Sequence, residues 1–150
     1  MIIGIASDHA GFDLKQKIFD RLTSLGHKVS DLGPLNSDSV DYPDYADRLC
    51  HWLNSESKKV PTYGILICGS GQGMAIRANK FKEIRAALCW DLASVRLARE
   101  HNDANVLCLG ARVVDESLNF QIVDTFLTTS FAGGRHEKRV AKLAKDINNY

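Results

Sequence analysis

The segment Gly64–Met74, GILICGSGQGM, joins a short apolar run ending in Cys68 to a loop with three glycines in five positions. An apolar run without alternation is typical of a strand that is covered on both faces of a parallel sheet. A glycine loop leading from such a strand into a helix exposes backbone N–H groups at a helix N-terminus. The segment therefore predicts a strand, an anion-binding loop and a helix in succession.

Similar runs recur along the chain, and the sequence predicts five strands: Ile2–Ser7, Lys28–Leu32, Gly64–Cys68, Arg85–Trp90 and Asn105–Leu109. Segments with helical periodicity lie between and after them. Three of them have apolar faces formed by Leu14, Ile18, Leu22 and Leu25 before Gly26, by Tyr45, Leu49, Trp52 and Leu53 after Pro43, and by Val140, Leu143 and Ile147. Two further helices are expected to be capped by Asp91 and Asp115. Alternating strands and helices indicate βαβ units. We therefore predict one α/β domain over residues 1–150, a three-layer α/β/α sandwich with a five-stranded parallel Rossmann-like sheet.

The composition excludes several classes of protein. The 150 residues are 45% hydrophobic and 25% charged with a net charge of +1, without the basic excess of nucleic-acid binders. A basic n-region and a run of 18 apolar residues are both missing, so we expect a cytoplasmic protein with no membrane partner. The four cysteines are expected to be reduced. Because no C-x-x-C or H-x-x-x-H spacing occurs, we expect no metal and no other cofactor.

Cys68 invites a chemical interpretation, because the field of a helix N-terminus favours thiolate and could lower its pKa below the ~8.5 of a free cysteine. The alternative is a small buried strand residue beside glycines that permit tight packing. A dinucleotide-binding G-x-G-x-x-G motif needs glycine where Met74 stands, and a C-x5-R phosphatase needs arginine there. The P-loop motif is also missing. Proton transfer is therefore the better use for the thiol.

Other polar residues belong to the same predicted edge or to helix ends. Ligands of open parallel sheets bind beyond the carboxyl ends of the strands, where Asp8 and His9 follow the first strand directly. On their own, these two residues would be a helix cap and a surface histidine. His101 ends a helical segment, and an imidazole there could act as acid or base near neutral pH.

A local positive charge lies near the C-terminus of this otherwise balanced chain. Arg135 and Arg139 are spaced i and i+4, which predicts one face of one helix, and two guanidinium groups suit the oxygens of a phosphate. Cations at the start of a helix oppose its dipole, so an anionic partner explains them better than solvent does. Arg112, after the fifth strand, is a third candidate for that anion.

Six blocks of sequence together resemble ribose-5-phosphate isomerase type B, of the sugar-phosphate isomerase family that includes galactose-6-phosphate isomerases. The resemblance covers essentially the whole chain. The blocks are Asp8-His9-Ala10-Gly11, Asp41-Tyr42-Pro43, Cys68-Gly69-Ser70-Gly71-Gln72-Gly73-Met74, His101-Asn102, Gly110-Ala111-Arg112 and the pair Arg135 and Arg139. One branch of the family uses a glutamate base at the position of Met74, so this chain resembles the cysteine type.

The resemblance implies an aldose-ketose isomerase of the pentose phosphate pathway, acting on ribose 5-phosphate and ribulose 5-phosphate through an enediolate without a metal. Cys68 would be the base that moves a proton between C1 and C2, with Ser70 assisting. His101 would open the furanose ring. The amides of Gly69–Gly73 would bind the enediolate oxygens.

The resemblance also assigns the binding residues and the assembly. Substrate contacts would come from Asp8, His9, Tyr42, Gly69, Ser70, Gly71, Gln72, Gly73, Asn102, Arg112, Arg135 and Arg139. Asp8 would also take part in catalysis, Asp8 and Tyr42 would lie near the sugar, Asn102 would bind it, and His9 and the three arginines would hold the phosphate. The family's site lies between two subunits, which implies a homodimer or homotetramer in which His101, Asn102 and the arginines come from the neighbour.

Two alternatives remain open on the sequence. Allose 6-phosphate or galactose 6-phosphate would undergo the same chemistry in a roomier pocket. A non-catalytic nucleotide or sugar-phosphate binding module would keep the glycine loop as a phosphate cradle, but it would need neither a base nor a ring-opening acid.

Overall fold

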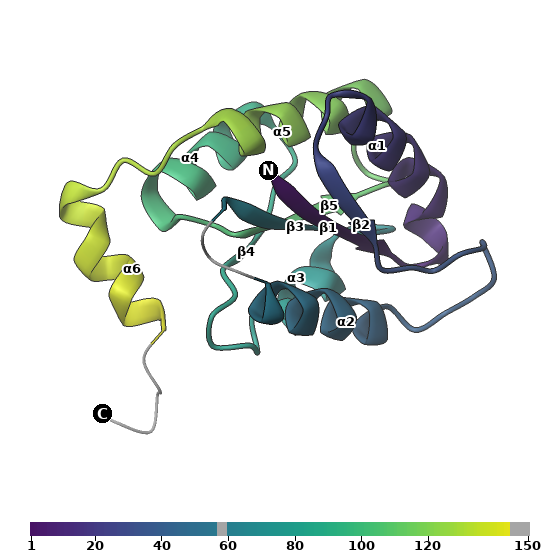
Figure 1. Ribbon diagram of the computed structural model, residues 1–150, viewed down its shortest axis with the longest axis horizontal. Helices are drawn as coiled ribbons and strands as arrows, with labels where there is room; N and C mark the ends of the chain where they lie inside the picture. The colour runs from purple at the N-terminus through teal and green to yellow at the C-terminus, as the bar shows by residue number, and fades with distance from the viewer. Residues whose placement is uncertain (57–59, 145–150) are drawn as a thin grey trace.

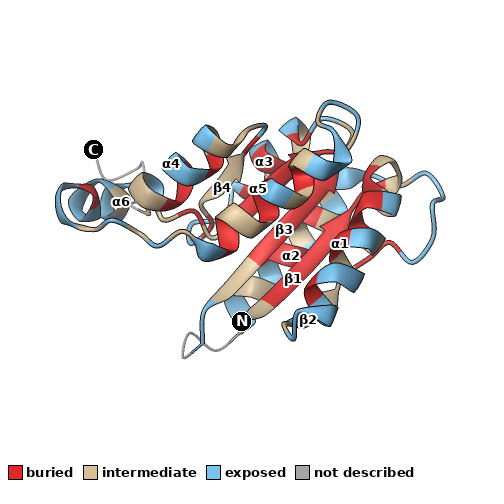
Figure 2. Cartoon of the chain, turned by 90° about the horizontal axis from the view of Figure 1, so that it is seen from above, coloured by how far each residue is buried: buried red, intermediate tan, exposed pale blue. Residues whose placement is uncertain are grey.

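The computed structural model describes residues 1–56 and 60–144 (Figure 1). All five predicted strands are present and pair in parallel in the order β2-β1-β3-β5-β4. Their bounds are β1 (Ile2–Ser7), β2 (Lys28–Asp31), β3 (Thr62–Cys68), β4 (Ala86–Leu88) and β5 (Val106–Gly110). The central strands β1, β3 and β5 are almost wholly buried, as the continuous apolar runs predict (Figure 2).

Helices cover both faces of the sheet, so the predicted three-layer α/β/α sandwich is confirmed (Figure 1). The elements are α1 (Phe12–Ser24), α2 (Tyr42–Ser55), α3 (Gln72–Ala78), α4 (Leu92–Asn102), α5 (Glu116–Thr128) and α6 (Glu137–Leu143), with short 3-10 turns η1 (His9–Gly11) and η2 (Gly134–His136). One apolar cluster packs α1, α4 and α5 on the sheet, and a second packs α2 and α3 on its other face. Within the described ranges, no helix is both long and apolar enough to cross a membrane.

Local chemistry sets the helix ends, with two departures from the sequence prediction. Gly26, at φ +81°, follows the end of α1, and Asp91 caps α4 by accepting the Ser94 N–H at 2.6 Å. Asp115 stands at the N-cap of α5, but its side chain makes no capping bond. Leu25, predicted on the buried face, is 56% exposed because α1 ends before it.

The C-terminal region differs from the prediction of one continuous helix. Arg135 lies in η2 and Arg139 in α6, so the two arginines do not share one α-helix. Leu143 is exposed, and Ile147 lies outside the described residues. Figures 1 and 2 both show α6 reaching beyond α4, away from α1 and the loop after β2.

Candidate active site

The strand order reverses direction between β1 and β3, which makes the carboxyl ends of these two strands the switch point of the sheet. Asp8 and His9 follow β1 there, and the glycine loop follows β3. The Asp8 N–H donates to the Ile67 carbonyl at 3.0 Å, which ties the two segments together. The fold therefore brings the first and third motifs of the sequence to the edge where ligands of such sheets bind.

Cys68 ends β3, and its thiol faces the loop that follows. The Gly71 N–H donates to Sγ of Cys68 at 3.1 Å. Gly71 can make this bond because it adopts φ +78°, and a Cβ there would lie 2.5 Å from Leu88 Cδ1. The loop thus directs a backbone dipole at the sulfur, which favours negative charge on it.

The loop also presents unpaired amides. Among the described residues, no hydrogen-bond acceptor pairs with the N–H groups of Gly69, Ser70 and Gly73. The Gln72 N–H has a long bond of 3.4 Å to Ser70 Oγ. The first N–H groups of a helix lack intrahelical partners, so the loop and the start of α3 can bind oxygen atoms that carry negative charge.

The four cysteines are free, as expected, and they differ in burial. Cys68 retains 5% of its surface, whereas Cys50 and Cys108 are fully buried and Cys89 is 1% exposed. Burial raises the pKa of Cys50 and of Cys89 to about 12, and it raises that of Cys108 well above its usual value. The three structural thiols therefore stay protonated near neutral pH.

Asp8 and His9 are both held in place by backbone N–H groups. Oδ1 of Asp8 accepts the Gly11 N–H at 3.0 Å, so its expected capping role is confirmed for η1. Nδ1 of His9 accepts the Val40 N–H at 3.4 Å from the loop that precedes α2. A neutral His9 in this arrangement carries its proton on Nε2 and can donate it to a ligand.

Tyr42 and Arg112 flank the glycine loop. A Cβ built on Gly73 would lie 2.5 Å from Cζ of Tyr42, so the phenol ring rests directly against the loop backbone. The Arg112 N–H donates to the Gly69 carbonyl at 2.9 Å, and its side chain lies over the same glycine. Tyr42 and Arg112 therefore lie beside the same loop, from Cys68 to Gly73, as the predicted site residues Asp8 and His9.

The remaining predicted site residues lie elsewhere in the chain. His101 and Asn102 end α4, which starts after β4 at the carboxyl edge of the sheet and runs about 16 Å toward the opposite edge. Arg135 and Arg139 lie beyond them in η2 and α6. One copy of the chain therefore does not bring these four residues to Cys68.

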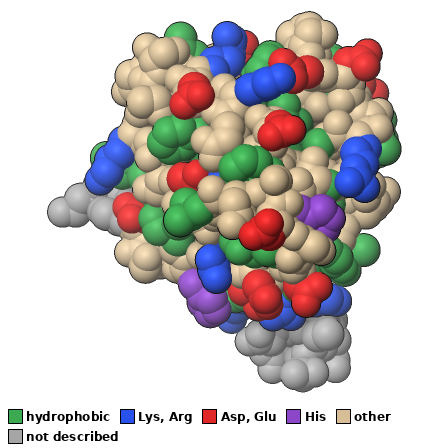
Figure 3. All heavy atoms as spheres, turned by 90° about the vertical axis from the view of Figure 1, so that its right-hand side faces the viewer, with side chains coloured by type: hydrophobic (Ala, Val, Ile, Leu, Met, Phe, Trp, Pro, Cys, Tyr) green, Lys and Arg blue, Asp and Glu red, His purple; other side chains and the backbone are tan. Residues whose placement is uncertain are grey.

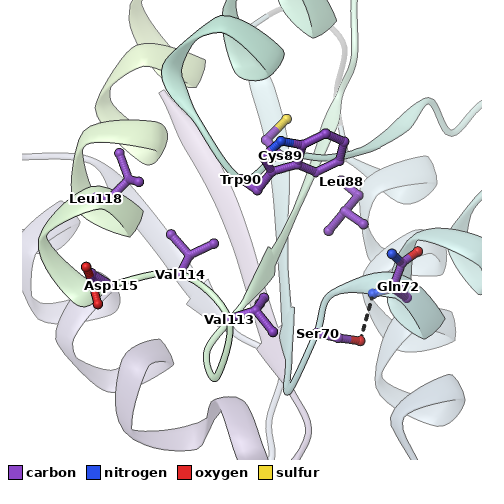
Figure 4. Close-up of a pocket in the computed structure, with 10 residues that line it drawn as sticks. Ser70, Gln72, Leu88, Cys89, Trp90, Val113, Val114, Asp115 and Leu118 are labelled. Carbon is purple, nitrogen blue, oxygen red and sulfur yellow. Dashed lines mark hydrogen bonds between the residues drawn. The ribbon is translucent and has the colours of Figure 1, made fainter.

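A cavity of about 540 Å³ borders the glycine loop (Figure 4). Ser70 and Gln72 form one side of it, facing Trp90 and Val113, which are both more than half exposed. Cys68 is not among its lining residues. The cavity is thus a hollow beside the glycine loop, and Cys68 does not open into it.

The face to which the carboxyl end of β1 points mixes acidic, basic, histidine and apolar side chains without a large patch of one sign (Figure 3). No three His, Cys, Asp or Glu side chains come together as a metal site within the part of the chain that the structure describes. This face therefore offers an anion no broad field of one sign.

Three buried residues with ionisable side chains were not predicted from the sequence. Lys15 is fully buried on α1, with Nζ 2.7 Å from both carboxylate oxygens of Asp31. Arg99 is 4% exposed near the end of α4, and His136 is 9% exposed in η2. Lys15 could have been noticed in the sequence, because it stands next to the apolar stripe of the first helix. Arg99 and His136 lie at helix ends, where such residues are ordinarily solvated.

Comparisons with known proteins agree with the fold and the motifs. A model of the Ribose/Galactose Isomerase family matches residues 3–143. The chain is 45% identical to ribose-5-phosphate isomerase B of Escherichia coli over 138 residues, covering 92% of this chain and 91% of that protein. It is 47% identical to the structure of the Clostridium thermocellum ribose-5-phosphate isomerase B, with a TM-score of 0.91 and coverage of 96% and 95%.

A further solved structure contains a sugar phosphate. The ribose-5-phosphate isomerase B of Mycoplasma genitalium, with bound ribulose 5-phosphate, is 45% identical to this chain, with a TM-score of 0.91 and coverage of 95% and 93%. The resemblance predicted from the six sequence blocks is therefore confirmed.

Proposed function

Because the chain belongs to the ribose/galactose isomerase family and is an isomerase, we propose that it interconverts ribose 5-phosphate and ribulose 5-phosphate. The bound ribulose 5-phosphate of the M. genitalium relative supports a five-carbon substrate. The reaction belongs to the pentose phosphate pathway and takes place in the cytoplasm. It moves protons within one molecule, so it needs neither a metal nor a redox cofactor.

One observation carries the proposal: the thiol of Cys68 stands at the switch point with the Gly71 N–H directed at Sγ. A base that moves a carbon-bound proton must reach two adjacent carbons while the negative charge on their oxygens is neutralised. The unpaired amides of the loop supply that second requirement. Preformed donors of this kind are worth about 3 to 4 kcal/mol each.

In the isomerisation, Cys68 as thiolate takes the proton from C2 of the open-chain aldose, and the electrons of the C–H bond form an enediolate. The Gly69 and Gly73 amides bind its oxygens. The proton then passes from Sγ to C1, while the hydroxyl proton moves from O2 to O1 by way of Ser70. Atoms and charge balance, and Cys68 is again a thiolate.

Binding and ring opening complete the cycle. We assign the sugar to Asp8, Tyr42 and Asn102, the loop contacts to Gly71 and Gln72, and the phosphate to His9, Arg112, Arg135 and Arg139. Opening the furanose breaks the C1–O4 bond; His101 gives a proton to O4, and the C1 hydroxyl gives its proton to Asp8. Remote binding of the phosphate holds the open chain for the proton transfer.

The site requires two copies of the chain. His101, Asn102, Arg135 and Arg139 are remote from Cys68 in one copy, whereas the chemistry needs all of them around one sugar. A homodimer in which each copy supplies these residues to its neighbour satisfies both conditions. Pairing of two such dimers would give a tetramer.

Initial rates with ribose 5-phosphate, allose 6-phosphate and galactose 6-phosphate test the substrate. We expect turnover of the pentose phosphate at least tenfold above either hexose phosphate.

Cys68→Ala should abolish turnover but retain competitive binding of inorganic phosphate, whereas Arg139→Ala should weaken phosphate inhibition. Near-normal turnover by Cys68→Ala would remove the thiol from the mechanism, and phosphate binding without turnover of any sugar by the unaltered protein would favour the binding module.

A further inference from the structure

His136 lies directly against His101. The two imidazole rings are stacked, with centroids 4.2 Å apart and planes inclined by 10°. No described residue makes a hydrogen bond to either ring, so the face-to-face contact is what orients them. A group that opens a sugar ring must aim one nitrogen at one oxygen, and the stack fixes the plane in which that nitrogen lies.

The segment that carries His136 is tied to the end of α4. The Ala132 N–H donates to the Glu100 carbonyl at 3.0 Å, and Arg99 donates from Nε to the Thr129 carbonyl at 3.3 Å. Within this exposed region, His136 is buried while its neighbours Arg135 and Glu137 are exposed. The burial of an imidazole between two exposed charged residues indicates a specific contact rather than a solvated turn.

The charges around the stack are mostly positive. His101 faces His136 from α4, and Arg135 and Arg139 act on it from its own segment, while the Glu137 carboxylate accepts the Gly134 N–H at 3.1 Å. Burial first, and then electrostatic interaction with His101, Arg135 and Arg139, lowers the pKa of His136 below its usual value.

We propose that His136 is a positioning residue for ring opening, whose imidazole, stacked on the His101 ring, fixes the plane of that ring. The proposal rests on the proposed function, in which His101 gives a proton to O4 as the C1–O4 bond breaks. His136 touches neither substrate nor proton in this account. It acts through the ring on which it is stacked.

The two directions of the reaction separate this role from general stability. Ribose 5-phosphate closes into a furanose and must be opened before its C2 proton can be removed. Ribulose 5-phosphate cannot close in the same way, because its O5 is esterified with phosphate, so it enters the site as the open chain. A defect confined to ring opening therefore lowers kcat from ribose 5-phosphate and spares kcat from ribulose 5-phosphate, whereas the ratio of the two kcat/KM values stays fixed by the equilibrium constant.

The test measures initial rates at saturating substrate in both directions for two variants of the protein, with oligomeric state and melting temperature as controls. His136→Ala removes the stack and should lower the rate from ribose 5-phosphate about tenfold or more, while the rate from ribulose 5-phosphate stays within about twofold. His136→Phe keeps a flat ring that cannot be protonated and should restore most of the loss. His51→Ala, which removes an exposed imidazole packed on Phe81, should change neither rate.

Equal losses in both directions would overturn the proposal, and so would a Phe variant as slow as the Ala variant, which would make His136 a proton carrier. If the Ala variant fails to fold, the directional comparison of His136→Phe with His136→Asn decides in the same way. His101→Asn separates the ring-opening role of His101 from the positioning role of His136. Without a directional difference in that variant, the proposed ring-opening role of His101 itself fails, whatever His136 does.

Discussion

Gly73→Ala should impair catalysis without destabilising the protein. Gly73 is the second residue of α3 and is not among the glycines with positive φ, so alanine is acceptable to the backbone. Its Cβ would lie 2.5 Å from Cζ and 2.6 Å from Cε2 of Tyr42. Because carbon atoms in contact are about 3.5 to 4.0 Å apart, the ring must retreat by at least about 1 Å.

The displaced ring is 40% exposed, so it can move toward solvent without disturbing the core. Alanine also favours a helix over glycine by up to about 1 kcal/mol. The free energy of unfolding should therefore change by no more than about 1 kcal/mol, measured by urea denaturation. A 1 Å displacement at a substrate contact can cost up to about 100-fold, so we expect kcat/KM to fall about 10- to 100-fold.

Gly26→Ala is the matched control, since Gly26 has φ +81° and no atom lies within 4 Å of the added Cβ. That change should cost about 1 to 2 kcal/mol through backbone strain and leave kcat/KM unaltered. In a Tyr42→Ala background, Gly73→Ala should cause no additional loss. Full kcat/KM in the Gly73→Ala single variant, or an undiminished loss in the double variant, would refute the contact with Tyr42 as the cause.

Two further expectations concern side chains that the structure buries. Iodoacetamide at pH 7.5 should alkylate Cys68 before the other cysteines, because burial raises the pKa of Cys50 and Cys89 to about 12. Intact-protein and peptide mass spectra give the order of labelling. Labelling of Cys50 or Cys89 before Cys68 would contradict this expectation. Lys15→Met should cost about 3 kcal/mol in urea denaturation, because it removes the cation that pairs with the Asp31 carboxylate. Lys17→Met, at an exposed ion pair, should cost less than about 1 kcal/mol, and equal losses would show that burial of Lys15 is immaterial.

The fold could be predicted from the sequence because its evidence is local. The apolar run before Cys68 and the glycines after it predict a strand, a glycine loop and a helix start, and the structure has all three. Parallel pairing then brings the motifs after β1 and β3 together without further information. Periodicity does not show where a helix ends. Leu25 has the spacing of the buried face of α1, but it follows the last residue of that helix.

The other half of the site could not be predicted from one chain's periodicity. The i and i+4 spacing of Arg135 and Arg139 suggests a single helix, whereas positive φ values at Gly133 and Gly134 introduce a 3-10 turn between the loop and α6. The stack of His136 on His101 joins residues 35 positions apart and leaves no pattern in the sequence. Only the geometry of the folded chain identifies such a contact.

Each half of the proposed site lies next to a buried cation, Lys15 in one half and Arg99 in the other. Lys15 holds Asp31, whose Oδ1 accepts the Gly33 N–H, and the Gly33 carbonyl accepts the N–H of the residue before Asp8. This network fixes the end of β1 before a ligand arrives.

Arg99 has the same function at the other end of the sheet. It donates to Oδ1 of Asp103 at 2.8 Å, to the Ala104 carbonyl at 2.7 Å and to the Thr129 carbonyl, which joins the end of α4 to the segment that carries His136. Burying a cation is costly unless several acceptors surround it, so each network is rigid by necessity. In the proposed dimer, the two networks would hold the two groups of site residues in place before the copies of the chain meet.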